Sequence, residues 1–246
     1  MARALTIDGP VGAGGTSLAK ELERELGIPG VPTSLFYRGY SEALRVQSLV
    51  PQELDEDFMS AWLPDNKARL AMVGSTMLLD GEDITGVCRT APNDIGSSHL
   101  AQFAVVRAEV NAETSNFVSR SAEDLVATEG RNEMVVHRDL GTLAFGVYLT
   151  ASPEVRAKRR AEQRGEQEIR SVLQDIARRD HSDMTRAVEP LCPAYGKKLI
   201  TVLDVEQVPL VIRGRQLLIP TDHLPARKVL EIVVDAVENY RIVKSE

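Results

Sequence analysis

The feature that most constrains this chain is a glycine-rich loop directly after its first apolar segment. Residues 5–7 form a short apolar run, residues 9–17 read GPVGAGGTS, and leucines recur every four residues over 18–26 before Gly27. This spacing predicts a strand, a tight loop and an amphipathic helix that stops at Gly27. A strand, a glycine-rich loop and a helix in this order are typical of phosphate binding, because backbone N–H groups and the helix N-terminus attract anions.

The loop fits the pattern G-x-x-x-x-G-K-[ST] except at its lysine. Gly9 and Gly14 have the required spacing and Thr16 occupies the position of a magnesium-binding hydroxyl, but Gly15 stands where the lysine belongs. We therefore expect a phosphate cradle without the side chain that reaches the outer phosphates. A tight strand-to-helix turn that binds nothing is the alternative. The cradle would consist of Gly9, Gly12, Ala13, Gly14, Gly15, Thr16 and Ser17.

Composition limits the class of ligand. The chain has 246 residues, 43% hydrophobic residues, 4% aromatic residues and a net charge of −7. Negative charge disfavours duplex DNA, and scarce aromatic residues disfavour a stacking surface for single strands. The two cysteines lie far apart, no apolar run has membrane-spanning length, and the first residues do not resemble a secretory leader. We expect a cytoplasmic monomer that binds neither nucleic acid nor membrane and holds anions through a local basic cluster.

Apolar periodicity predicts further elements along the chain. Strands are expected at 134–136 and 147–149, and hairpins at 69–83 and 208–219. Helices are expected at 34–49, from Ser97 or Ser98 past Val110, from Pro153, from about Leu173 to Arg179, and from Pro225. Strands alternating with helices predict an α/β fold with a parallel sheet flanked by helices, and the hairpin at 69–83 predicts an inserted subdomain.

Several segments between about residue 5 and residue 204 resemble the bacterial cytidylate (CMP/dCMP) kinases. They are IDGPVGAG at 7–14, Tyr37-Arg38 after Thr33, GEDIT at 81–85 with Arg89, Ser98 with Arg107, RDLGT at 138–142, LTASPEVRAKRR at 149–160, and the spaced residues Arg179, Asp180, Asp183 and Arg186 before Pro190-Leu191. Gly15, Pro32, Ser34 and His137 depart from the family pattern. The resemblance implies a single P-loop kinase domain over 1–246. Its core would comprise 1–52, 98–155 and 187–246, with a monophosphate-binding insert at about 53–97 and a helical lid at about 156–186.

The resemblance also implies ATP-dependent phosphorylation of CMP or dCMP with Mg²⁺ bound at Thr16. The acceptor would be held by Thr33, Tyr37, Arg38, Ser98, Arg107, Arg179, Asp183 and Arg186. Arg138, Asp139, Arg156 and Arg160 would act on the transferring phosphoryl group, although Asp139 could instead only orient Arg138. The missing lysine leaves two alternatives open. One is a nucleotide-binding relative that has lost transfer, and the other is a kinase of a different small phosphorylated acceptor.

Overall fold

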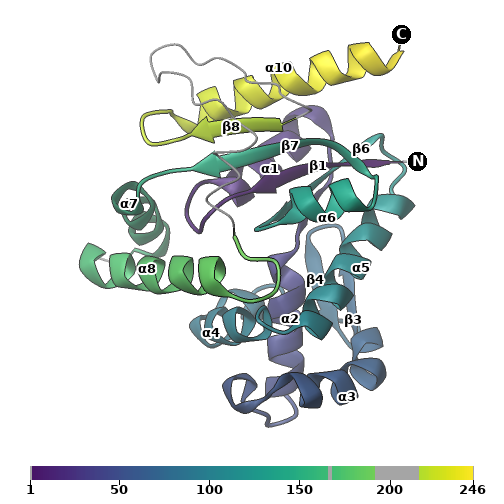
Figure 1. Cartoon of the computed structure of the whole chain (residues 1–246), viewed down its shortest axis with the longest axis vertical. Coiled ribbons are helices and arrows are strands. Elements are labelled where there is room, and N and C mark those ends of the chain that lie inside the picture. The colour runs from purple at the N-terminus through teal and green to yellow at the C-terminus, as the bar shows by residue number, and fades with distance from the viewer. Residues whose placement is uncertain (1, 166–167, 192–215, 246) are drawn as a thin grey trace.

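The computed structural model, which describes residues 2–165, 168–191 and 216–245, is built around a parallel sheet (Figure 1). The strand order is β2-β6-β1-β7-β8. These strands are β1 (Arg3–Asp8), β2 (Gly30–Pro32), β6 (Leu125–Gly130), β7 (Leu143–Thr150) and β8 (Gln216–Pro220). All neighbouring strands pair in parallel. The predicted α/β fold with a parallel sheet is confirmed.

Helices cover both faces of this sheet, which explains why its strands are apolar rather than alternating. On one face α1 (Gly15–Leu26) and α10 (Ala226–Ser245) pack together over Leu5 and Ile7 of β1. On the other face lie α5 (Ala104–Arg120) and α6 (Glu133–Asp139), which pack against β1, β6 and β7. The helices predicted after the loop and from Pro225 are therefore confirmed, and both supply apolar side chains to the core.

A second group of helices, with a small sheet, lies below the parallel sheet in Figure 1. It contains α2 (Ser34–Arg45), α3 (Glu56–Asn66), α4 (Ala91–Leu100) and an antiparallel sheet of β3 (Leu70–Val73), β4 (Thr76–Leu79) and β5 (Glu82–Asp83). Short 3-10 turns at Pro51–Glu53, Lys67–Arg69 and Val87–Arg89 connect these elements. Tyr40, Met59 and Met77 are fully buried where they meet. The predicted strands at 69–83 are confirmed, whereas a functional insert at 53–97 stays a prediction.

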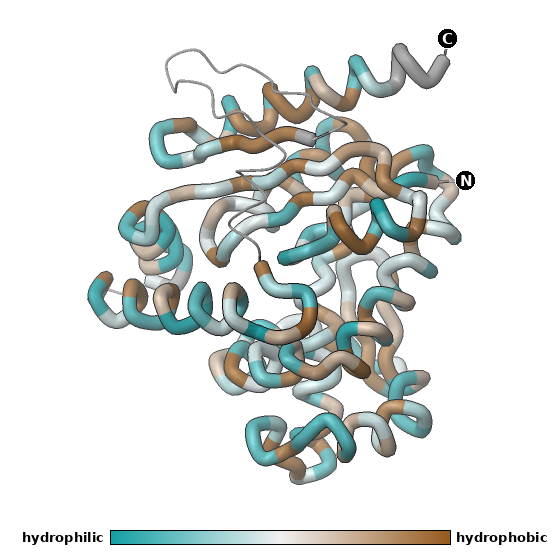
Figure 2. Tube along the Cα trace, in the orientation of Figure 1, coloured by the Kyte–Doolittle hydropathy of each residue, from teal (hydrophilic) through white to brown (hydrophobic). Residues whose placement is uncertain are grey.

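A helix pair, α7 (Pro153–Arg164) and α8 (Ile169–Thr185), lies at the carboxyl end of β7 beside the glycine-rich loop. Ala157, Ala161, Val172 and Ile176 form the small apolar seam between the two helices, and Val11 of the loop joins it. Figure 2 shows that the rest of the pair is mostly hydrophilic. The helix predicted from Pro153 is confirmed, and the second helix extends beyond Arg179. That this pair acts as a lid stays a prediction.

Three sequence predictions fail or fall outside the described residues. The expected strand at 134–136 is helix α6, which begins at Glu133. The helix expected from Ser97 or Ser98 past Val110 is two helices, because the chain leaves helical geometry between Leu100 and Ala104. Of the hairpin expected at 208–219, residues 208–215 lie outside the described part of the chain. The remainder enters β8, which pairs in parallel with β7.

No helix among residues 2–165, 168–191 and 216–245 combines the length and the apolar character that membrane crossing requires.

Candidate functional site

The glycine-rich loop passes so close to the rest of the sheet that its first residue has no room for a side chain. A Cβ atom on Gly9 would lie 2.3 Å from the carbonyl oxygen of Leu149 in β7. Gly14 caps the N-terminus of α1 with a φ of 111°, a conformation that L-residues rarely adopt. The loop therefore wraps tightly from β1 into α1, as the pattern of glycines predicts.

A cleft of about 610 Å³ opens over this loop. All seven predicted cradle residues line this cleft. Five arginines from four separate segments of the chain line it as well. The arginines that line it are Arg38, Arg131, Arg159, Arg160 and Arg179. Such a concentration of guanidinium groups opposite a helix N-terminus suits a ligand with several phosphates. The local basic cluster expected in this acidic chain is therefore present.

An acidic side chain lies beside the position of the missing lysine. A Cβ atom on Gly15 would lie 3.1 Å from both Cγ and Oε1 of Glu129, at the end of β6. The Thr16 hydroxyl donates to Glu129 Oε2 at 3.2 Å. Burial raises the pKa of the Glu129 carboxyl, while nearby Arg131 and the Thr16 hydrogen bond act in the opposite direction. A hydroxyl and a carboxylate at this place fit Mg²⁺, which prefers oxygen ligands and is often bound through only one or two carboxylates.

Asp94 of α4 gathers the arginines that face the cleft. Arg38 of α2 forms an ion pair with it, Arg160 Nη2 lies 3.2 Å from Oδ2, and Arg179 Nη1 lies 3.6 Å from Oδ1. Arg131, which pairs with Asp183, adds another charge near Arg179. Burial, and then the proximity of Arg131, lower the pKa of Arg179 to about 10. Burial and neighbouring cations thus disfavour the charge on Arg179, and an anion bound in the cleft would favour it.

Arg156, predicted to act on the phosphoryl group, instead holds the loop in place. Its side chain is almost fully buried, and it donates to the carbonyl oxygens of Val11 at 3.1 Å and Ala151 at 2.9 Å. It also forms a bidentate ion pair with Asp180 of α8, with distances of 3.0 and 2.6 Å. Arg156 does not line the cleft. It therefore ties the loop to the helix pair and acts as a positioning residue.

Arg138 and Asp139 do not reach the loop. The prediction that they act on the phosphoryl group depended on a strand at 134–136. The structure has a helix there, and both residues lie in the last turn of α6 and not at the carboxyl end of a strand. Their side chains are 52% and 62% exposed, and they pair with each other at 2.9 Å. Neither lines the cleft. The basic and acidic groups that occupy the strand end are Arg131 and Glu129, which follow the buried strand β6.

Arg186, one of the predicted acceptor residues, has a buried side chain. Its side chain is 3% exposed, and it binds Asp183 Oδ1 at 2.9 Å and the carbonyl oxygens of Val188 and Glu189 at 3.1 and 2.8 Å. Asp183 in turn accepts from Arg131 at 3.0 Å. Arg186 Nη2 is buried and has no hydrogen-bond partner within the described part of the chain. A buried charged donor without a partner is costly, and it indicates a place for a ligand oxygen.

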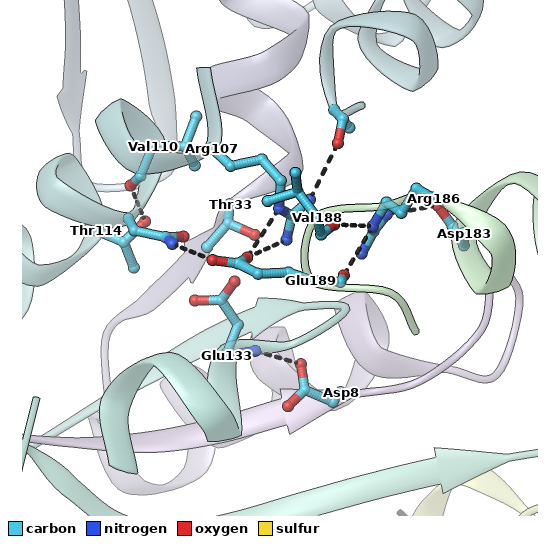
Figure 3. Close-up of polar contacts among 12 residues, drawn as sticks. Asp8, Thr33, Arg107, Val110, Thr114, Glu133, Asp183, Arg186, Val188 and Glu189 are labelled. Atoms are coloured by element: carbon cyan, nitrogen blue, oxygen red, sulfur yellow. Dashed lines mark hydrogen bonds and ion pairs between the residues drawn. The ribbon is translucent and has the colours of Figure 1, made fainter. Parts of the chain in front are cut away.

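Arg107 of α5 meets a carboxylate that the sequence did not predict. Glu189 Oε2 accepts hydrogen bonds from Arg107 Nε, at 2.8 Å, and from Nη2 (Figure 3). The guanidinium carbon lies 5.8 Å from the centre of the Tyr37 ring, within the range of a cation–π contact. Tyr37, Arg107 and Glu189 thus form one wall beside Arg186. The other two predicted acceptor residues are Thr33, whose hydroxyl donates to the Glu129 carbonyl at 3.0 Å, and Ser98, half-buried in α4.

Two buried acids lie beneath that wall. The Asp8 carboxylate accepts from the backbone N–H groups of Glu133 and Met134, each at 2.8 Å, and so caps helix α6. Burial raises the pKa of Asp8 to about 6 despite those two hydrogen bonds. Glu133 lies between Asp8 and Glu189 in Figure 3, and burial, with the charge of Asp8, raises its pKa to about 8. Glu133 therefore carries its proton at neutral pH.

Sequence reasoning missed Glu129, Arg131, Asp94 and Glu189. Arg131 had a sequence signal, because it comes shortly after the apolar run at 125–127. The other three acids carry no local pattern. Their roles depend on contacts with residues more than 50 positions away in the chain.

Comparison with known proteins connects this geometry with one family. The family model "Cytidylate kinase" matches residues 5–208. The cytidylate kinase of Mycobacterium leprae is 30% identical over 217 residues, which cover 84% of this chain and 91% of that protein. Those of Thermus thermophilus and Pseudomonas putida are 35% and 33% identical, covering 74% and 87% of this chain and 84% and 95% of the relatives.

A solved structure supports the fold alone. The Thermus thermophilus protein TT1252 superposes with a TM-score of 0.50 and 18% identity, covering 97% of each chain. Together the glycine-rich loop at the end of β1, the arginines opposite it and the match over residues 5–208 show that the chain belongs to the cytidylate kinase family.

Proposed function

We propose that this protein transfers the γ-phosphoryl group of ATP to CMP or dCMP. The observation that carries the proposal is the cleft over the glycine-rich loop, which joins a helix N-terminus to five arginines from four segments of the chain. An oxygen of the acceptor phosphate attacks the γ-phosphorus, the bond from that phosphorus to the β–γ bridging oxygen breaks, and ADP leaves. Such a transfer needs positioning and charge neutralisation more than it needs a proton acceptor.

The phosphates of ATP would bind the backbone of Gly12, Ala13, Gly14 and Gly15, and the acceptor would bind on the side of Arg38, Arg131 and Arg179. Thr16 and Glu129 would hold Mg²⁺, which neutralises charge on the outer phosphates. The unpartnered Nη2 of Arg186 supports an acceptor oxygen next to Asp183. These assignments rest on the cleft lining and on the hydrogen bonds described above.

The charge that the missing lysine would supply has to come from another residue. Arg159 and Arg160 of α7 line the same cleft as the loop. Arg159 is anchored on Thr221, whose hydroxyl accepts at 2.8 Å, so its guanidinium is held close to the loop. We assign these two arginines the role of neutralising the transferring group. This assignment favours an active kinase over a relative that only binds nucleotides.

A coupled ADP-release assay tests the proposal. The protein would be supplied with MgATP and, in separate reactions, with CMP, dCMP, UMP, AMP and GMP. Preferred turnover of CMP or dCMP is expected. Absence of turnover with every acceptor, together with CMP binding in calorimetry, would identify a nucleotide-binding relative that lacks transfer. Absence of both turnover and binding with CMP and dCMP would overturn the proposal and favour a different phosphorylated acceptor.

A further inference from the structure

Arg159 differs from the other arginines of the cleft in the groups that hold it. Each of the other four forms an ion pair with an aspartate. In the part of the chain that the structure describes, no carboxylate pairs with Arg159, and its guanidinium instead donates to two uncharged oxygens of Thr221. Uncharged oxygens orient a guanidinium without cancelling its charge. Arg159 therefore keeps its full charge for a ligand of the cleft.

Thr221, which follows β8, is fixed from two further sides. The residue is 2% exposed, and its N–H donates to the Thr150 carbonyl at the end of β7, at 2.7 Å. Its hydroxyl lies 3.1 Å from the same carbonyl oxygen and 3.3 Å from the carbonyl oxygen of Ala13 in the glycine-rich loop. A hydroxyl has one proton to donate and two lone pairs to accept with. It can therefore bond to the strand end or the loop and still accept from Arg159.

This arrangement places a cation opposite the position of the missing lysine. Gly15, Arg159 and Thr221 all line the cleft over the loop. A lysine at position 15 of such a loop reaches the outer phosphates of the nucleotide. A guanidinium has five N–H donors, and the contacts with Thr221 use two of them. Arg159 thus retains donors as well as charge for the same phosphates.

The contact with the Thr221 hydroxyl decides where this cation lies. Arg159 Nη1 donates to the hydroxyl at 2.8 Å, and Nη2 donates to the carbonyl oxygen of the same residue. Two bonds from the two ends of one guanidinium fix its plane as well as its position. An arginine that is ordered before the nucleotide binds does not have to lose its side-chain freedom during binding.

We propose that Thr221 is a positioning residue whose hydroxyl holds Arg159 over the glycine-rich loop, where this arginine does the work of the lysine that Gly15 replaces. This inference rests on the proposed function and deepens it, because it names the residue through which α7 delivers its charge. Thr221 itself takes no part in bond breaking. The competing role is purely structural, with a hydroxyl that only joins the end of β8 to β7 and the loop.

Two substitutions of Thr221 separate its hydroxyl from its shape. Thr221→Val removes the hydroxyl and keeps the volume, whereas Thr221→Ser keeps the hydroxyl and removes a methyl group. The experiment measures kcat with CMP at saturating MgATP. Thr221→Val is expected to lower kcat by about tenfold to hundredfold, because a displacement of about 1 Å at a reacting group has an effect of this size. Thr221→Ser is expected to restore kcat to within about threefold of the native value.

A second charge in the loop tests what Arg159 does there. In a Gly15→Lys background the lysine supplies the charge directly, so Thr221→Val is expected to lower kcat by no more than about twofold. The matched background is Gly15→Ala. It adds the same Cβ atom, 3.1 Å from the Glu129 side chain, without a charge. There Thr221→Val is expected to have its full effect. Residues that act through one group are not additive in such a cycle, whereas independent residues are.

Arg159→Gln provides a second variant on a partly exposed helix face. It removes the charge and leaves Thr221 unchanged, and Gly15→Lys is expected to restore its kcat as well. Calorimetry with MgATP and MgADP gives a readout that does not depend on turnover. Because the charge acts on the outer phosphates, Thr221→Val and Arg159→Gln are expected to reduce the preference for MgATP over MgADP by about threefold to tenfold. A structural defect would weaken the binding of both nucleotides equally.

An equal loss of kcat for Thr221→Val in the native, Gly15→Lys and Gly15→Ala backgrounds would overturn the inference and establish the structural role. A Thr221→Ser enzyme as slow as Thr221→Val would overturn it too, since the methyl group would then be the part that matters. Arg159→Gln with native kcat would show that this arginine does not replace the lysine. A native protein that phosphorylates neither CMP nor dCMP would refute the proposed function instead, and the ratio of the MgATP and MgADP dissociation constants would still decide the role of Thr221.

Discussion

Replacement of Glu133 by glutamine is expected to change how the stability of the protein depends on pH. Glu133 is 5% exposed and faces Asp8 of β1, Arg107 of α5, Glu189, Thr33 and His137 of its own helix. Its pKa rises from 4.5 to about 8, chiefly through burial. Between these values the folded protein binds a proton that the unfolded chain has released, so the free energy of unfolding falls as the pH rises.

The size of the effect follows from proton linkage. One proton of difference changes the free energy of unfolding by about 1.4 kcal/mol per pH unit. Near pH 7 this term lowers stability by about 1 kcal/mol per unit, because part of the folded population has already lost the proton. Asp8, whose pKa rises to about 6, contributes the same sign at lower pH. Burial lowers the pKa of His137 from 6.5 to about 4, so its contribution has the opposite sign and is lost as the pH falls.

Urea unfolding of native protein and Glu133→Gln at several pH values from 6.5 to 7.8 isolates the Glu133 contribution. Asp8 and His137 titrate mainly below this pH range, so the change of the difference with pH reports chiefly on Glu133. The stability advantage of the native protein is expected to shrink by about 1 kcal/mol per pH unit across this range. Glu123→Gln serves as the exposed control and is expected to keep a constant difference from native protein. A constant difference for Glu133→Gln as well would refute the assignment of a buried, protonated acid.

Three further results are expected from the same site. Gly15→Lys should raise kcat with CMP by up to about 10²-fold in steady-state kinetics while leaving CMP affinity nearly unchanged, because it adds a fixed charge at the loop. The control Gly15→Ala should keep a kcat within about twofold of the native value. A lower kcat for Gly15→Lys than for the native protein would contradict the prediction. Arg179→Ala should weaken nucleotide binding tenfold or more in calorimetry, as expected for a lost charge-assisted contact. Its exposed neighbour Arg178, which pairs with Asp175 in the same helix, should tolerate the same change, so equal losses would argue against a role for the cleft. Hydrogen exchange in α7 and α8 should slow when ATP and CMP are both bound, and unchanged exchange with both ligands bound would remove the lid assignment.

The first 27 residues could be predicted because their structure is decided locally. A short apolar run, closely spaced glycines and leucines four residues apart leave few alternatives to a strand, a tight loop and a helix. The structure gives β1, a loop and α1, ending at the left-handed Gly27. The seven predicted cradle residues line one cleft for the same reason, since they are close together in the sequence, and their binding of phosphate stays a prediction.

The strand predicted at 134–136 was wrong because a residue distant in the sequence determines the secondary structure there. Met134, Val135 and Val136 resemble a buried strand, but the Asp8 carboxylate, 125 positions earlier than Glu133, accepts the first N–H groups of a helix there. A capping contact of this kind is stabilising and is absent from any local pattern. Arg138 and Asp139 were consequently misplaced, and the strand that positions Glu129 and Arg131 was not recognised.

The positive charge of this site comes from α2, α7, α8 and the segment after β6, and not from the glycine-rich loop. At Gly15 the loop faces the carboxylate of Glu129, whereas Arg159, Arg160 and Arg179 reach the cleft from α7 and α8. Arg156 fastens the same helix pair to the loop through the Val11 carbonyl and Asp180. The charge opposite the phosphates therefore depends on how two helices dock onto the loop. A lysine in the loop would place its charge on the same element that binds the phosphates. In this protein the loop would bind the phosphates and the helices α7 and α8 would supply the charge, so neutralisation requires that these elements pack together.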